Sequence, residues 1–205
     1  MRSHILALCM TAAGVAGVSQ SAIAQIVAQS SLPESWSRDV PGGQFENLLQ
    51  LVTCKANVFS AAVTVDHLNQ DASGRFGPTV RIMLATQDAT KPAAGPIETA
   101  VLEISATSAS QVPRASFSRF GAGAQLLDRT DLGEVALGKK TAFDLQWNDS
   151  GVTASIDGGE KHQAKLGTRP LSMLLIISGA AARFSEMRSG FEGAPSTGCT
   201  PSATP

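Results

Sequence analysis

Apolar and polar residues alternate over two neighbouring stretches of the chain, residues 141–147 and 152–156. In the first stretch Phe143, Leu145 and Trp147 fall on one side of an extended segment, while the Asp and Gln between them fall on the other side. A period of two is typical of a β-strand with one buried face. The Asn-Asp-Ser-Gly segment between the stretches and the Asp-Gly-Gly segment after them tolerate positive φ, so they predict tight turns. The two stretches therefore predict consecutive antiparallel strands.

Five further runs have the length and composition of strands. Gly, Pro, Asn or Asp residues separate them, as expected for strands joined by turns. Their ranges are 58–66, 79–86, 97–105, 114–120 and 124–130. No helical run lies between them, which argues against the crossover helices of a parallel sheet. We therefore expect an all-β protein built as an antiparallel β-sandwich.

Residues 43–53 have a less decisive pattern. Phe45, Leu48, Leu49 and Val52 recur at i, i+3, i+4 and i+7. This spacing fits one short amphipathic helix, but over so few residues it fits an irregular strand equally well. The sequence leaves both alternatives open.

The two tryptophans have different surroundings. Trp147 is in phase with the apolar face of its strand, so we expect it in the core. Trp36 ends a lead-in segment and is flanked by polar residues. A tryptophan there could offer an exposed apolar ring beside a polar N–H, so we predict Trp36 as a possible ligand contact.

The last third of the chain resembles a known fold family. It reads LGKKTAFDLQW, a turn, VTASIDGG, then PLSMLLIIS and AARFSEM. This pattern is similar to the closing strands of the concanavalin-like lectin and glucanase jelly rolls, including the laminin-G-like and alginate-lyase-like branches. The resemblance implies that the sandwich is a jelly roll and that Phe184 of the last strand enters the core.

The catalytic motifs of that family are missing from the sequence. Alginate lyases of this fold carry an Arg-rich strand, a Gln-Ile-His strand and a catalytic Tyr, whereas this chain contains no Tyr. The glucanase branch places its carboxylates on alternate positions of one strand, and no such run occurs. Glu98 and Glu103 are five residues apart, so on one strand they would point to opposite faces, and we expect both to be ordinary solvated acids. We therefore predict no catalytic residues.

Two acidic segments have oxygen-bearing side chains at spacings similar to those of cation-binding sites. Asn69 to Gly74 has oxygen side chains at alternate positions, as in the first half of a calcium loop, but Val80 stands where the closing Glu belongs. Asp128, Asp131 and Glu134 make an acidic segment that we interpret as a loop. Turns commonly contain such residues, so we predict no metal and no cofactor, while a structural calcium ion at either segment stays open.

The first 24 residues have the features of a secretory signal peptide. Arg2 precedes an apolar run, and Ala22-Ile23-Ala24 offers the small residues that signal peptidase requires. The apolar run is too short for a stop-transfer helix, so we expect no integral membrane segment after signal removal. We divide the rest into a lead-in packed on the domain (25–57), the sandwich (58–191) and a Ser/Thr/Pro-rich tail (192–205).

Removing the leader leaves two cysteines, Cys54 and Cys199. In an exported protein an even pair favours a disulfide, and this one would tie the tail down. Zinc requires three or four ligands, which this pair does not supply.

Charge excludes one class of partner. The chain has 16 basic and 17 acidic residues, and because only Arg2 lies in the leader, the mature net charge is −2. No basic cluster larger than Lys139-Lys140 occurs, which argues against nucleic-acid binding.

We therefore expect an exported, non-catalytic concanavalin-like binding module, periplasmic or secreted, that recognises a glycan or another envelope protein. Two alternatives stay open. The first is a polysaccharide lyase or glycoside hydrolase of the same fold with catalytic residues that the motifs do not reveal. The second is a structural envelope protein with no ligand. The aromatic content of 5% argues against stacking platforms for sugars.

Overall fold

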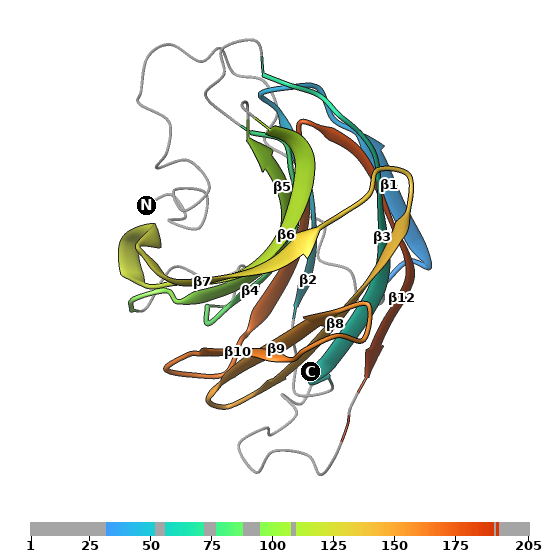
Figure 1. Cartoon of the computed structure of the whole chain (residues 1–205). Coiled ribbons are helices and arrows are strands. Elements are labelled where there is room, and N and C mark those ends of the chain that lie inside the picture. Colours follow the sequence, from blue (N-terminus) through green and yellow to red (C-terminus); the bar gives the residue numbers. More distant parts are fainter. Residues whose placement is uncertain are drawn as a thin grey trace, which may run out of the picture.

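The fold is a sandwich of two antiparallel sheets. A computed structural model describes residues 32–51, 56–71, 77–87, 95–107, 110–190 and 192. Within these ranges the chain forms twelve strands and one turn of 3₁₀ helix, Ala122–Ala124. The strands pair into two six-stranded sheets that pack face to face (Figure 1). The predicted all-β antiparallel sandwich is confirmed.

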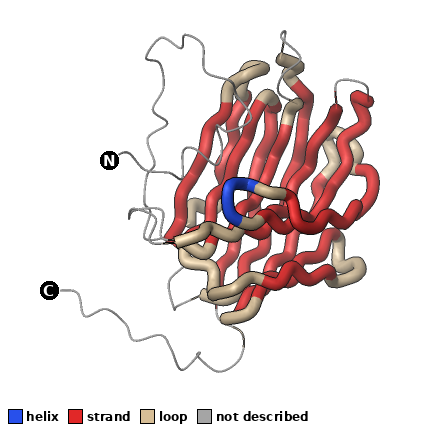
Figure 2. The backbone as a smooth tube through the Cα atoms, turned by 90° about the vertical axis from the view of Figure 1, so that its left-hand side faces the viewer, coloured by secondary structure: helices blue, strands red, loops and turns tan. Residues whose placement is uncertain are grey.

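The two sheets curve in the same direction, so one presents a concave outer face and the other a convex one (Figure 1). The concave sheet has the order β2-β11-β4-β5-β6-β7. It consists of β2 (Phe45–Leu51), β4 (Thr79–Ala85), β5 (Thr99–Thr107), β6 (Ser110–Phe120), β7 (Leu126–Glu134) and β11 (Ser172–Ser178). Figure 2 turns the concave side toward the viewer and shows its strands side by side.

The convex sheet has the order β1-β12-β3-β8-β9-β10. It consists of β1 (Ser35–Asp39), β3 (Val58–Leu68), β8 (Lys140–Asn148), β9 (Gly151–Ile156), β10 (His162–Lys165) and β12 (Ala180–Gly190). In β8 buried and exposed residues alternate strictly, as the sequence pattern predicts.

The core lies between the sheets. Its largest fully buried side chains include Phe59, Phe143 and Phe184 of the convex sheet, which pack in one cluster with Ile82 and Leu102 of the concave sheet. Burying one such side chain contributes about 1.5–3 kcal/mol, so this layer is the main source of stability. The core positions predicted for Trp147 and Phe184 are confirmed, because their exposed fractions are 2% and 0%.

The helix predicted as one alternative for residues 43–53 is wrong, since Phe45–Leu51 form strand β2. Leu48 joins the main core, whereas Leu49 joins a separate apolar cluster on the outer face of the same sheet. Apolar residues on both faces of a strand give adjacent hydrophobic positions in the sequence. This pattern imitates the i+3, i+4 spacing of a helix.

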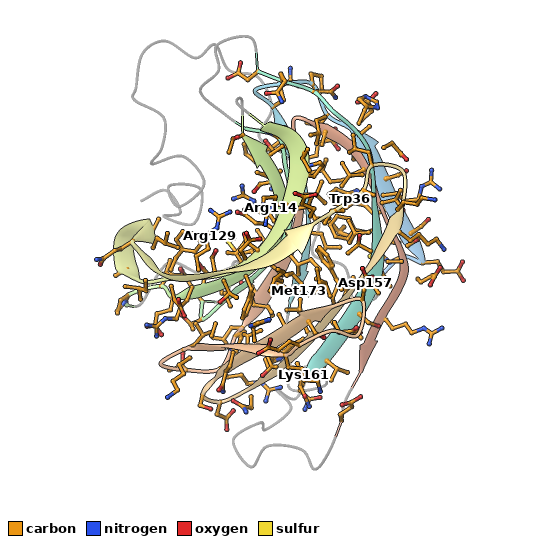
Figure 3. The ribbon with its side chains drawn as sticks, viewed as in Figure 1. Trp36, Arg114, Arg129, Asp157, Lys161 and Met173 are labelled. Atoms are coloured by element: carbon orange, nitrogen blue, oxygen red, sulfur yellow. The ribbon has the colours of Figure 1, made fainter. Side chains whose placement is uncertain are left out.

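Trp36 is buried, which contradicts the expectation that it is exposed. It belongs to β1, and its exposed fraction is 7%. Its ring stacks on Phe184 of β12 with the centroids 5.7 Å apart, and both residues belong to the main core cluster. Figure 3 labels Trp36, which lies between the sheets. The polar neighbours misled the prediction, because in a strand they point away from the face that the tryptophan occupies.

Arg38 lies over the ring of this tryptophan. Its guanidinium carbon lies 5.6 Å from the centroid of the Trp36 ring, and its Nε pairs with Glu46 of the concave sheet. The predicted lead-in segment therefore supplies one strand to each sheet. A ligand contact through Trp36 would require an open ring face that the structure does not provide.

Both predicted turns of the β8–β9 region are present. Asn148 Oδ1 accepts hydrogen bonds from the Ser150 amide at 2.9 Å and from its hydroxyl at 2.8 Å. Asp157 has φ 48° and Gly158 φ 67°, and Asp157 Oδ1 accepts a hydrogen bond of 2.7 Å from the Ala142 amide. Aspartate and glycine are among the residues that tolerate this left-handed conformation.

Several predictions concern residues outside the described ranges. These are the signal peptide, both cysteines of the predicted disulfide, and all of the tail except Glu192. Within the described ranges, no helix has the length and apolar character needed to cross a membrane.

Candidate functional site

Charged side chains gather on the outer face of the concave sheet, where β4, β5, β6 and β7 lie side by side. We call Arg81, Glu103, Arg114, Arg129, Asp131 and Glu134 the concave-face cluster. The backbone register explains the grouping: Arg81 lies opposite Glu103, Glu103 opposite Ser116, and Ser116 opposite Asp131. Figure 3 labels Arg114 and Arg129, which lie on the hollow side of the sheet.

Glu103 is the most enclosed member of the cluster. Its side chain is 14% exposed, and its two oxygens face different arginines, with Arg81 Nη2 at 3.7 Å and Arg129 Nη2 at 3.5 Å. The Ser116 hydroxyl lies 3.5 Å from Oε1. The expectation that Glu103 is an ordinary solvated acid is therefore wrong, because two cations and a hydroxyl surround it.

These two ion pairs are loose. A charge-assisted N–H···O bond is about 2.7–2.9 Å long, so neither distance to Glu103 corresponds to a tight hydrogen bond. Arg129 is 49% exposed and Arg81 33% exposed. Arg81 Nη2 donates a hydrogen bond of 2.9 Å to the Thr79 hydroxyl, and Arg81 Nε is buried. Arg129 is therefore the arginine whose donors can reach a ligand, while Glu103 supplies an acceptor beside it.

Arg114 forms the tighter half of the cluster. Its Nη2 lies 2.6 Å from Asp131 Oδ2, and its Nη1 lies 3.2 Å from Glu134 Oε1. Asp131 and Glu134 are three residues apart, which in a regular strand would send them to opposite faces. A β-bulge at Gly133, where φ is 108°, shifts the register and brings both acids to Arg114.

The pairing of Arg114 with Asp131 shifts the pKa of both groups. The hydrogen bond from Arg114 holds the pKa of Asp131 below its ordinary value, and the Gly133 amide, 3.0 Å from Oδ1, acts in the same direction. The same partner raises the pKa of Arg114. Asp131 is therefore ionised at neutral pH, and it remains an acceptor rather than a proton donor.

The other half of the concave face is apolar. It carries the cluster Leu49, Met83, Val101, Leu174 and Ile176, all of which are buried. Four arginine and acid side chains next to it are about half exposed or more: Arg114, Arg129, Asp131 and Glu134. The open part of this face is consequently the charged part.

The structure describes one of the two acidic segments in full, because residues 72–74 of the segment from Asn69 to Gly74 lie outside the described ranges. Asp128, Asp131 and Glu134 lie on strand β7, so the interpretation as a loop is wrong. Asp128 is the strand neighbour of Arg129 and therefore points to the opposite face. Asn69 donates hydrogen bonds of 2.8 Å to Asp39 Oδ1 and to the Val40 carbonyl.

Among the residues that the structure describes, no group of three or more His, Cys, Asp and Glu side chains could hold a metal ion. Glu98 lies just before β5 and accepts a hydrogen bond from the Gly167 amide. It contributes to the packing of a loop, and it does not join Glu103.

Comparisons with known proteins identify the fold. The structure is similar to the apo Crh5 transglycosylase, with 13% identity, a TM-score of 0.51, and coverage of 86% of this chain and 82% of that chain. The fold is a concanavalin-like jelly roll. The resemblance read from the closing strands is confirmed.

Two further structures are similar with lower scores. A carbohydrate binding module from Bacillus subtilis matches with 11% identity, a TM-score of 0.48, and coverage of 80% of this chain and 100% of that chain. An alginate lyase from Alteromonas sp. 272 matches with 10% identity, a TM-score of 0.47, and coverage of 69% and 74%. The sequence matches no family profile and no curated protein.

Proposed function

We propose that this chain is a non-catalytic glycan-binding module that holds an oligosaccharide against the charged part of its concave face. The observation that carries the proposal is the position of Glu103, enclosed between Arg81, which is 33% exposed, and the half-exposed Arg129, with both ion pairs loose. The fold alone does not assign a function, so we infer the function from this group of side chains.

The chemistry of the cluster suits hydroxyl groups. Each sugar hydroxyl both donates and accepts hydrogen bonds, so it needs a donor and an acceptor side by side. Arg129 offers guanidinium donors next to the carboxylate oxygens of Glu103. Arg129 lies on β7 and Glu103 on β5 of the same sheet, with β6 between them, so the sheet fixes both side chains at their bases and lowers the entropy lost on binding.

A binding role also agrees with the state of Asp131. Glycoside hydrolysis requires a carboxylic acid with a raised pKa to protonate the leaving group. Arg114 instead lowers the pKa of Asp131, and this favours the ionised form at neutral pH. Asp131 therefore serves to orient Arg114 rather than to donate a proton.

The proposal includes export, because the leader has the composition of a signal peptide and a glycan-binding module meets its ligands outside the cell. The periplasm and the cell exterior both satisfy it.

The test is a glycan array printed with neutral and uronate-containing oligosaccharides, followed by calorimetry on the best ligand. Arg129→Ala should weaken binding about tenfold, the effect of losing one charge-assisted hydrogen bond. The matched control is Arg183→Ala, an exposed arginine on β12 of the convex sheet, which should bind like the parent.

The same samples should be assayed for released reducing ends and for unsaturated uronates. Unchanged affinity in Arg129→Ala would remove the concave-face cluster from the binding site. Release of products by the parent would show that the protein is an enzyme.

A further inference from the structure

A pocket opens on the outer side of the convex sheet, across the sandwich from the concave-face cluster. It is a half-open depression with a volume of about 490 Å³. Strands β3, β8, β9 and β12 line it, together with the turn that follows β9. Figure 3 labels Lys161, which belongs to its rim, below β8 and β9.

The backbone register explains the shape of the pocket. Arg188 of β12 lies opposite Ser60 of β3, Ser60 opposite Asp144 of β8, and Asp144 opposite Ser155 of β9. The two serine side chains are short, so they leave a depression in the outer surface of the sheet on both sides of Asp144. The long side chains of Arg188 and Lys161 stand at the two ends of this row.

A β-bulge places Arg188 in the row. Between Ser185 and Arg188 the register with β3 shifts by one residue, and Glu186 has φ 55°. The shift turns Met187 into the core and Arg188 outward. Non-glycine residues avoid this φ, so the chain keeps a strained conformation at the position that aims Arg188 at the pocket.

Four polar side chains of this pocket take no part in holding the fold together. Within the described part of the chain, the side chains of Ser60, Asp144, Gln146 and Lys161 form no hydrogen bond and no ion pair. Asp144 and Gln146 are exposed on β8. The pocket thus presents a free carboxylate, a free amide and a free ammonium group toward one space.

We infer that this pocket is a second glycan site, which takes a neutral sugar unit independently of the concave-face cluster. Asp144 accepts hydrogen bonds from two neighbouring hydroxyls, and Arg188, Lys161 and Gln146 donate to other ring substituents. The charges of Asp144 and Glu192 balance those of Lys161 and Arg188, which favours an uncharged ligand over a uronate.

Two such sites on opposite faces make the module bivalent. One domain would then contact two glycan chains, or two stretches of one chain, and gain avidity over either site alone. The pocket taken alone binds weakly, because its lining contains no exposed aromatic ring for stacking.

The experiment is an NMR titration of the ¹⁵N-labelled mature chain with lactose, cellobiose and sucrose at millimolar concentrations, and with glucuronate as the charged probe. The amides of Ser60, Asp144, Gln146 and Thr153 should shift with one of the neutral sugars. Asp144→Ala should weaken this binding at least about tenfold. Asp66→Ala, which removes an exposed carboxylate of β3 outside the pocket, should not.

Arg129→Ala separates the two sites. The proposal requires that the pocket amides still shift in this variant, whatever happens on the concave face. Three results would overturn it: no shift with any neutral sugar, equal binding by Asp144→Ala and the parent, or shifts with glucuronate alone.

Discussion

Single residues in the concave-face cluster show how a partner changes the chemistry of a side chain. Asp131 and Glu103 lie two strands apart on the same face, yet only Asp131 is held by a short contact from an arginine. The short contact favours the ionised form of Asp131, whereas the looser contacts at Glu103 leave room for a ligand hydroxyl.

The state of Asp131 gives a prediction about pH. Its folded pKa is lower than its unfolded value of about 3.9, so the stabilisation from its pair with Arg114 is present above that pH and is lost as the pH falls through the folded pKa. In Arg114→Ala the pKa of Asp131 should rise toward the unfolded value, while the hydrogen bond from the Gly133 amide still holds it down in part. Carboxyl ¹³C NMR of both proteins measures this change.

Arg183→Ala is the matched control for this titration, because it removes an arginine from the other sheet. It should leave the titration of Asp131 unchanged. If Asp131 titrates identically in Arg114→Ala and in the parent, the hydrogen bond in the structure does not govern its ionisation.

These residues could not be grouped from the sequence. Arg81, Glu103, Arg114 and Arg129 come from four different strands, and only the cross-strand register brings them together. The one local signal was a charged residue out of phase with the apolar positions of a strand, such as Arg81 between Val80 and Ile82. That signal predicts an outward side chain, and it does not identify the partner.

At the scale of elements, the sequence predicted best those strands with one buried face. The alternation in β8 matched the structure residue by residue. It failed for β2, which contacts apolar residues on both faces, and for β1, which is too short to show a period. The β-bulges could not be predicted from the sequence either. A bulge is one extra residue in one of two paired strands, and the pairing is known only once the fold is known.

The bulge in β12 allows a prediction at this scale. Glu186→Gly and Glu186→Ala both lose the ion pair with Lys140, so their difference isolates the backbone strain at φ 55°. Glycine adopts this φ without a clash, so Glu186→Gly should be more stable than Glu186→Ala by about 1 kcal/mol. Urea denaturation gives both free energies of unfolding.

The control is the same pair of substitutions at Asp66, where φ is ordinary and alanine should be the more stable of the two. Alanine equal to glycine at position 186 would show that the backbone is not strained there.

At the scale of the whole molecule, the fold itself could be predicted because its determinants are spread along the chain. Alternation, turn residues and the lack of helical runs all indicated an antiparallel sandwich, and no single residue decided the outcome. The sites, in contrast, depend on a few residues in specific strand registers. No set of independent sequence patterns indicates them, so they could not be predicted in the same way. The two proposed glycan sites lie on opposite sheets, so each can be removed without disturbing the other.

The predicted disulfide between Cys54 and Cys199 concerns the whole chain as well. A bond closing a loop of about 145 residues restricts the unfolded chain strongly, and loop entropy alone predicts about 5 kcal/mol. Strain in the folded state reduces this value, so Cys54→Ala/Cys199→Ala should lose about 2–5 kcal/mol while its far-ultraviolet circular dichroism stays that of a β-sandwich. Chemical denaturation of the oxidised parent and the double variant measures the loss. Thiol counting in denaturant comes first, since two free thiols in the exported protein would show that the bond does not form.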